Sequence, residues 1–384
     1  MTRKSTRNSR KIIIGLIGDG VFHHSREILM GAKEWCLKQP AIQTKVFPPS
    51  RYIDDIHAQE NNELDALVIF KMRAEELQAV RQSARHVVCT SSDSEGASIP
   101  SVIIDNQAIG RMAAQYFLHR RYSSFACAHR PSRSWSQDRI NGFRETLREA
   151  GHEPAIFEFE EDITPLEAVL AAPRPVAVFC PSDIIARRLI DRMVEMDIHI
   201  PREMAVLGVD DDPYQNCLCS IPLSSVRLPG HMIGSLAAEL AYRLSKGEPA
   251  PKEPVRTQPI RIVSRLSTDF YTTKDAIVLR ALKTIDRQIH SIHGTEDLVR
   301  LVGIPRRTLD FRFRSQLGHT IHEELTLARL NKAREYLAST DMNADEIAER
   351  IGLSEGRMLT LLLKRKAGMT PSEFRRSTLP RLSP

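Results

Sequence analysis

Long hydrophobic runs are missing from this chain of 384 residues. Its apolar runs, such as residues 66–70 and 359–363, fall far below the roughly 18 uncharged residues of a membrane-spanning helix. The apolar stretch after the basic N-terminus is interrupted by Gly15 and ends at Asp19, so it lacks the longer apolar centre and the cleavage site of a secretory signal. We therefore expect a cytoplasmic protein without membrane contact.

Cysteine is also scarce. The six cysteines are scattered, and only Cys217 and Cys219 lie close together, which is too sparse for the disulfide framework of a secreted domain. Neither this pair nor His23 and His24 has the further ligands that a metal site needs. The glycine-rich phosphate loop is missing too, because residues 15–20 do not have the G-x-G-x-x-G spacing. We expect ordinary thiols, no metal and no cofactor.

The charge is distributed unevenly along the chain. With 42% hydrophobic and 27% charged residues the chain is globular, and its length predicts two or three domains at roughly 100–200 residues each. Residues 1–11 carry five basic and no acidic side chains, residues 12–276 carry 30 basic and 35 acidic ones, and residues 277–384 carry 19 basic and 13 acidic ones. The net charge of +6 therefore comes from the two ends, a tail that we expect to be disordered and a basic C-terminal domain.

Short β-branched runs alternate with helix-like stretches from residue 12 to about residue 263. Continuous apolar runs of this length are typical of parallel strands that are buried on both faces. The expected strands are residues 12–17, 67–70, 86–89, 102–104, 124–128, 176–180 and 205–209. The expected helices are residues 25–38, 107–121, 135–150 and 183–197. We therefore predict an α/β domain with parallel sheets over residues 12–270.

Polar loops follow several of the expected strands. Because ligands of open α/β sheets bind beyond the carboxyl ends of the strands, these loops predict a site for a small polar ligand. The loops are residues 19–26, 105–106, 129–139, 181–183 and 210–212. In one alternative, residues 182–183 and 210–212 only cap helices or turns. In another, Arg139 pairs with Asp138, and Trp135 belongs to the core.

After residue 270 the strand signature disappears, and residues 277–384 contain two copies of one helical pattern. Each copy is a short helix, a glycine turn and a second helix, which is the helix-turn-helix pattern whose second helix enters the major groove of DNA. The motifs are residues 295–316 and 343–367, and residues 271–290 form a linker and a first helix. We predict an all-α domain. A helix over residues 321–338 would hold the two motifs about 27 Å apart, close to one turn of DNA.

The second helix of each motif presents basic side chains opposite an apolar stripe. Leu309 and Phe313 form the stripe in the first copy, and Met358, Leu359, Leu362 and Leu363 form it in the second. Cationic side chains bind phosphates and guanine edges. The expected DNA-contacting residues are Arg306, Arg307, Asp310, Arg314, Arg357, Thr360, Lys364 and Arg365. These could also be solvated faces of a helical bundle, but two aligned copies, each followed by Gly-x-Thr, favour DNA binding.

Residues 295–376 resemble the DNA-binding domain of the AraC family of transcription regulators. The match runs through Leu309-x-x-x-Phe313-Arg314, Gly318-x-Thr320, Arg329-Leu330-x-x-Ala333, Leu337, Ile347-Ala348-x-x-x-Gly352, Lys364 and Gly368-x-Thr370-Pro371-x-x-Phe374-Arg375. Phe311 and Leu361 depart from it, since the family usually carries Arg there, and residues 355–359 replace a stretch rich in Ser, Tyr and Phe. The resemblance implies sequence-specific binding to double-stranded DNA, with RNA polymerase as a partner of an activator.

Residues 12–270 resemble the two-lobed, periplasmic-binding-protein-like sensor of the LacI/GalR family. The match runs through Arg139-x-x-Gly142-Phe143, Ser182-Asp183, Leu207-Gly208-Val209-Asp210-Asp211, Ser224-Ser225-Val226 and residues 261–269. Such a sensor ahead of an AraC-type domain is the arrangement of the xylose operon regulator (XylR) group. The resemblance implies a homodimer controlled by a sugar, xylose or another pentose.

The resemblance also implies how the sugar is held. Arg139 would grip sugar hydroxyls and Asp210 would accept hydrogen bonds from them, while Trp135 or Phe22 offers an apolar platform. The implied ligand-binding residues are Ser25, Arg26, Trp135, Arg139, Ser182, Asp183 and Asp210. Closure of the lobes would reorient the helical domain.

The sequence therefore predicts a ligand-controlled transcription regulator, not an enzyme. A sugar-binding receptor without a transcriptional role would share the α/β domain, but it requires a secretory signal and has no use for residues 277–384. A sugar-processing enzyme would need a nucleophile, a base and an orienting group in one constellation, and none is evident.

Overall fold

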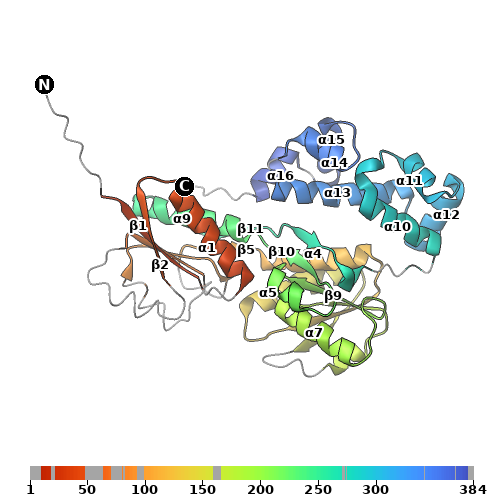
Figure 1. Cartoon of the computed structure of the whole chain (residues 1–384), viewed down its shortest axis with the longest axis horizontal. Coiled ribbons are helices and arrows are strands. Elements are labelled where there is room, and N and C mark those ends of the chain that lie inside the picture. Colours follow the sequence, from red (N-terminus) through yellow and green to blue (C-terminus); the bar gives the residue numbers. More distant parts are fainter. Residues whose placement is uncertain are drawn as a thin grey trace.

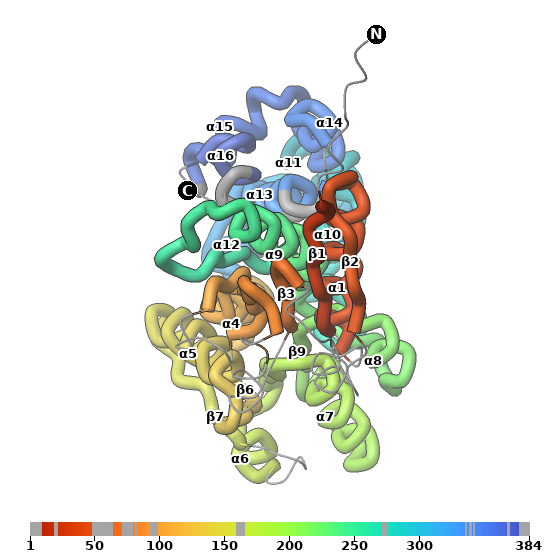
Figure 2. The backbone as a smooth tube through the Cα atoms, turned by 90° about the vertical axis from the view of Figure 1, so that its left-hand side faces the viewer, coloured from red at the N-terminus to blue at the C-terminus, as the bar shows by residue number. Residues whose placement is uncertain are grey.

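The computed structural model describes residues 10–18, 22–47, 64–70, 80, 83–92, 99–158, 166–269, 273, 275–340, 342–367 and 369–378. The basic tail up to residue 9 and the loop residues 19–21 lie outside this range. The chain forms two α/β lobes and a helical domain that is stacked along one side of them, as Figure 1 and Figure 2 show from two directions. Within the described ranges no helix is long and apolar enough to cross a membrane.

The N-terminal lobe is built on a parallel sheet in the order β2-β1-β3-β4. Its strands are β1 (Ile12–Ile17), β2 (Ile42–Phe47), β3 (Ala66–Ile69) and β4 (Val87–Cys89). Helices α1 (His23–Leu37) and α9 (Gly230–Ser245) pack against each other and bury apolar side chains together with this sheet. The chain therefore returns to this lobe near the end of the α/β domain.

The C-terminal lobe is built on a sheet in the order β12-β10-β9-β8-β6-β7, parallel except for β12. Its strands are β6 (Ser124–His129), β7 (Ala155–Glu158), β8 (Val176–Phe179), β9 (Met204–Val209), β10 (Ser224–Arg227) and β12 (Arg261–Val263). Its helices are α4 (Asn106–His119), α5 (Ser134–Glu149), α6 (Glu167–Leu170), α7 (Asp183–Glu195) and α8 (Pro213–Leu218). The paired strands β5 (Val102–Ile104) and β11 (Val255–Thr257) carry the chain between the lobes.

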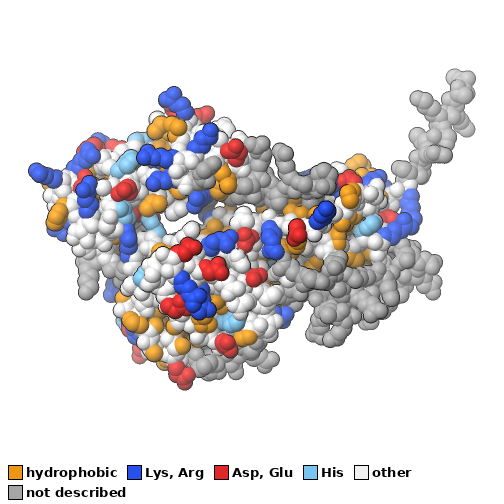
Figure 3. Space-filling model, turned by 180° about the vertical axis from the view of Figure 1, so that it is seen from behind, with side chains coloured by type: hydrophobic (Ala, Val, Ile, Leu, Met, Phe, Trp, Pro, Cys, Tyr) orange, Lys and Arg blue, Asp and Glu red, His pale blue; other side chains and the backbone are white. Residues whose placement is uncertain are grey.

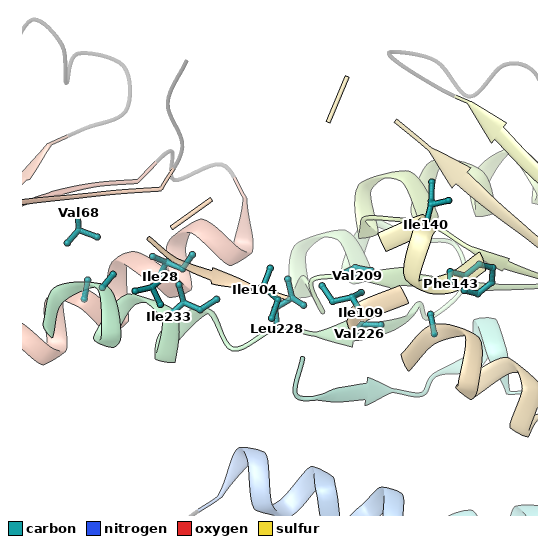
Figure 4. Packing of buried hydrophobic residues seen from close by; sticks show 14 of the residues in the cluster. Ile28, Val68, Ile104, Ile109, Ile140, Phe143, Val209, Val226, Leu228 and Ile233 are labelled. Carbon is teal, nitrogen blue, oxygen red and sulfur yellow. The ribbon is translucent and has the colours of Figure 1, made fainter. Parts of the chain in front are cut away.

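One cluster of buried apolar residues runs through both lobes. Ile28 and Val68 belong to its part in the N-terminal lobe, and Phe143 and Val209 to its part in the C-terminal lobe (Figure 4). The strands are buried on both faces, because side chains of the other parity form separate apolar clusters, with Leu67 and Ile69 in the N-terminal lobe and Val176 and Val178 in the C-terminal lobe. The predicted α/β architecture with parallel sheets is thus confirmed.

The helical domain has two apolar cores that share one long helix. Its helices are α10 (Ala276–Gln288), α11 (Thr295–Val302), α12 (Arg306–Leu317), α13 (Ile321–Ser339), α14 (Ala344–Arg350), α15 (Gly356–Ala367) and α16 (Pro371–Thr378). The first half of α13 packs in a core with α10, α11 and α12, and its second half in a core with α14 and α15. With 19 residues α13 is about 28 Å long, which matches the predicted connecting helix.

Candidate DNA interface and ligand site

The first helix-turn-helix motif consists of α11 and α12. Gly303 ends α11 with a φ of 69°, a left-handed conformation that glycine adopts without strain. Leu309 and Phe313 are completely buried on α12, so Arg307 and Arg314 lie on its exposed face, as predicted. Two of the other predicted residues form an ion pair, since Arg306 Nε lies 3.7 Å from Asp310 Oδ2. Arg306 also pairs with Glu296, at 2.6 Å.

The second motif consists of α14 and α15. Leu359 and Leu363 are completely buried, while Arg357, Lys364 and Arg365 are exposed. The half-buried Thr360 donates its hydroxyl to the carbonyl of Gly356 at 3.1 Å, one turn back along α15. Figure 3 shows basic side chains mixed with acidic ones over one face of the helical domain.

The prediction that Met358 belongs to the core of the second motif was wrong. Its side chain is 42% exposed. Met358 lies one residue before the buried Leu359, and a step of about 100° per residue turns it away from the core.

Arg329 joins the two motifs, a role that sequence reasoning missed. It is buried in the middle of α13 and is only 6% exposed. Its guanidinium donates to the carbonyls of Ile292 and His293, which precede α11, at 2.7 and 2.9 Å. It also donates to the carbonyls of Ile351 and Gly352, in the turn of the second motif, at 3.1 Å each. One side chain therefore fixes the orientation of both motifs relative to α13.

In the α/β domain, Arg139 on α5 is the centre of the predicted ligand site. It is buried and donates from Nε to Asn106 Oδ1 at 2.9 Å and from a terminal nitrogen to the carbonyl of Pro181 at 2.5 Å. The half-buried Trp135 lies under its guanidinium, with 4.9 Å between Cζ and the ring centroid. Asn106 and Pro181 are therefore two partners of Arg139 that the sequence analysis, which considered Asp138, did not foresee.

The contact between Arg139 and Asn106 depends on a close approach of α4 and α5. A Cβ atom on Gly110 of α4 would lie 1.9 Å from the carbonyl oxygen of Arg139. A Cβ atom on Gly142 of α5 would lie 2.1 Å from the carbonyl oxygen of Gln107. Only glycine fits at both positions, and the first turn of α4 is thereby held beside Arg139.

Two carboxyl groups of the predicted ligand set are buried and act on each other, and the charge of Arg139 acts on one of them, Asp210. Asp183 is buried and accepts from Ser225 Oγ at 2.6 Å and from the backbone N–H of Asp212 at 2.8 Å. Burial, with the charge of Asp210, raises the pKa of Asp183 well above its usual range. Burial also raises the pKa of Asp210 to about 7, although the charge of Arg139 acts in the opposite direction. Asp210 is therefore poised to change its protonation state near neutral pH.

Other residues of the predicted polar loops have structural partners or are buried. Asp212 caps α8 by accepting from the N–H of Tyr214 at 2.9 Å, and Ser182 caps α7. Both residues therefore cap helices, and a ligand contact of Ser182 stays a prediction. Arg26 on α1 lies 4.0 Å from Asp212 Oδ1 and so faces the other lobe, whereas Ser25 is completely buried.

His24 on α1 lies in the first of the predicted polar loops but was not among the predicted ligand residues. Burial and the positive charges of Arg139 and His23 lower the pKa of His24 to about 3. The charge of Arg139 thus acts on this imidazole from the C-terminal lobe, while the ring itself packs edge-on against Phe70, with 6.1 Å between the ring centroids. The described residues contain no group of three side chains that could hold a metal ion. The sequence signal that could have pointed to His24 is its position in the first polar loop.

The far end of α4 contacts the helical domain through Glu324 on α13. Glu324 is 3% exposed, and its two carboxylate oxygens face His119 Nε2 at 3.2 Å and His319 Nε2 at 2.5 Å. Burial alone would raise the pKa of Glu324, but hydrogen bonds from His119 and His319 lower it to about 2. Arg121 donates to His319 Nδ1 at 2.6 Å and to the carbonyl of Leu317, the last residue of α12. Helix α4 therefore runs from Arg139 to the end of a recognition helix.

Comparisons with known proteins agree with both parts of this description. Residues 114–268 match the periplasmic binding protein-like domain, and residues 298–377 match a helix-turn-helix domain. The chain is 25% identical to the xylose operon regulatory protein of Escherichia coli (strain K12) over 291 residues, which is 71% of this chain and 73% of that protein. It is 29% identical to the xylose operon regulatory protein of Haemophilus influenzae over 290 residues, 72% of this chain and 74% of that protein.

Solved structures show the same fold. The structure of the xylose-binding transcription activator xylR covers 96% of this chain and 98% of its own, with a TM-score of 0.58 and 22% identity. The transcription regulator CcpA of Lactococcus lactis covers 67% of this chain and 100% of its own, with a TM-score of 0.57 and 18% identity. The xylR structure is similar to this chain over both the α/β domain and the helical domain, whereas the CcpA structure is similar to part of this chain.

The fold and these matches define a DNA-binding transcription regulator with a ligand-sensing domain. The chain is homologous to the xylose operon regulatory proteins and joins a periplasmic-binding-protein-like domain to an AraC-type helix-turn-helix domain. These relatives are regulatory proteins, which agrees with the prediction of a regulator.

Proposed function

We propose that this protein controls transcription in response to a pentose, with xylose as the first candidate, that binds where the two lobes meet. The observation that carries the proposal is the placement of Arg139, Asp183 and Asp210 beyond the carboxyl ends of the strands, where the buried Arg139 bonds to Asn106 and lies over Trp135. A guanidinium and a carboxylate together match the acceptors and donors of sugar hydroxyls. The names of the relatives support xylose.

The coupling to DNA would run through α4. Its first residue, Asn106, bonds to Arg139, and its last residue, His119, faces Glu324 of the helical domain. A sugar shifts DNA affinity only by its preference for one arrangement of the lobes. A change at Arg139 would therefore reach α13 through a single helix of 14 residues.

The other partners follow from this role. The protein would act in the cytoplasm on double-stranded promoter DNA, as a homodimer, and would contact RNA polymerase when it activates transcription. The predicted DNA contacts are the exposed cations of α12 and α15, and the predicted sugar contacts are the side chains around Arg139.

The test is a thermal shift measurement on the full chain with a panel of pentoses, hexoses and polyols. We expect a pentose to raise the melting temperature, and Arg139→Ala to abolish the shift. Arg192→Ala is the matched control, because Arg192 is an exposed arginine on α7 that pairs with Glu195. The proposal fails if no compound of the panel shifts the melting temperature of the unaltered protein.

A further inference from the structure

The outer faces of both recognition helices carry a large apolar side chain. Phe311 on α12 is 72% exposed, and Leu361 on α15 is 56% exposed. The two residues occupy equivalent positions, because each comes two residues after a buried leucine, Leu309 or Leu359, and two residues before another buried side chain. An apolar side chain is therefore left exposed at the same position of both recognition helices.

Each of these side chains lies between two cations. Helical spacing of four and three residues places Arg307, Phe311 and Arg314 in one stripe of α12. The same spacing places Arg357, Leu361 and Lys364 in one stripe of α15. Both stripes point away from the apolar cores, and all four cations are exposed.

A single exposed apolar residue on a protein surface needs no explanation. These two differ, because they stand where a recognition helix faces the major groove and their charged neighbours fit the phosphates on either side. In the major groove the C5-methyl group of thymine is the apolar feature that the bases present, and side chains such as Phe contact it. An Arg at the same position would instead select guanine.

We propose that Phe311 and Leu361 read thymine methyl groups, one in each half of the DNA site, about one helical turn apart. This inference rests on the proposed function and adds a base preference to it. The matching stripes predict that both half-sites contain an essential A·T pair at the equivalent position, flanked by phosphates that Arg307, Arg314, Arg357 and Lys364 contact.

The experiment uses the full chain and double-stranded DNA selected from a pool with a random central segment. Each thymine of the selected site is then replaced by deoxyuridine, which removes only the methyl group. We expect one position in each half-site to lose about fourfold in affinity, the value of one buried methyl or methylene group. Every other thymine should tolerate the replacement.

Protein variants assign each methyl group to its reader. Phe311→Ala should bind more weakly and lose the deoxyuridine effect in one half-site only, and Leu361→Ala should lose it in the other half-site. Phe311→Arg should shift the preferred pair at its position from A·T to G·C. Leu301→Ala is the matched control, since Leu301 is an apolar side chain of α11 that is 48% exposed. This variant should keep both deoxyuridine effects.

The outcomes separate this inference from the function on which it rests. If no DNA sequence is selected, the proposed function fails. If DNA is selected but deoxyuridine is tolerated at every position, the function stands and thymine reading by Phe311 and Leu361 is overturned. It is also overturned if Phe311→Ala keeps its affinity and its deoxyuridine effects but loses transcriptional activity, because the side chain then contacts a protein.

Discussion

Asp210 has a backbone φ of 117°, which residues other than glycine rarely adopt, and Asp211 follows with a φ of 51°. Such strain persists only where the surroundings hold it, and here Asp211 is paired with Arg265 at 2.7 Å. The sequence motif predicts Asp210 as a ligand residue. It did not reveal that Asp211 and Asp212 have structural partners, because the sequence does not distinguish the environments of three consecutive aspartates.

The protonation of Asp210 should link sugar binding to pH. Burial raises its pKa to about 7, and a carboxylate accepts hydroxyl hydrogen bonds better than a neutral acid, so sugar affinity should fall as the pH drops from 8 to 6. Calorimetric titration across this range checks the expectation. Asp210→Asn should remove the pH dependence and weaken binding at pH 8, whereas Asp191→Asn, on the outer helix α7, should behave like the unaltered protein.

The protonation of Asp210 should also change the free energy of unfolding, and here the carboxylate is the less favourable form. The folded pKa of about 7 lies above the unfolded value of roughly 4, so between pH 4 and 7 the folded state binds more protons and the sugar-free protein loses stability as the pH rises. We expect Asp210→Asn to raise the free energy of unfolding at pH 8 by about 1–2 kcal/mol. Denaturant titration at pH 5 and pH 8 measures this, and an equal effect at both values would contradict it.

At the scale of elements, apolar runs predicted most strands, including the edge strand β4 and the linking strand β5, and missed β2, β7 and β10. Strands β1, β3, β6, β8 and β9 lie where continuous apolar runs were found. Edge strands β2 and β7 leave part of their residues exposed, and β10 begins with Ser224 and Ser225, which are buried against other polar groups. These strands owe their place to the sheet, which a local pattern does not contain.

The helix-turn-helix elements were predicted within one residue, because caps, turn glycines and apolar spacing are local. Their mutual orientation depends on Arg329, whose partners lie in sequence segments before and after it. Arg329→Gln should lower the free energy of unfolding of the helical domain by about 3 kcal/mol, since it leaves buried carbonyls without donors. Its affinity for a complete DNA site should fall more than its affinity for half a site. Arg287→Gln, an exposed change on α10, is the control for both measurements.

For the whole molecule, the contact between sensor and helical domain joins residues about 200 positions apart, such as Arg121 and His319. No pattern along the chain indicates it, because His119, Arg121, His319 and Glu324 look like ordinary polar residues at helix ends. The sequence predicted both domains and an effect of one on the other. The physical link became visible only when the fold brought the end of α4 to α13.

Glu324 should therefore be needed for the response to sugar more than for either binding event. In Glu324→Gln the two histidines lose a buried carboxylate, so α4 and α13 are no longer held together by a charged group. We expect sugar affinity and sugar-free DNA affinity within about threefold of the unaltered protein, while the change in DNA affinity caused by sugar, typically 5- to 150-fold in such systems, falls towards one. Fluorescence anisotropy of labelled DNA with and without sugar measures this ratio. Glu349→Gln, an exposed change on α14, should keep the full ratio, and a full ratio in Glu324→Gln would exclude α4 as the coupling route.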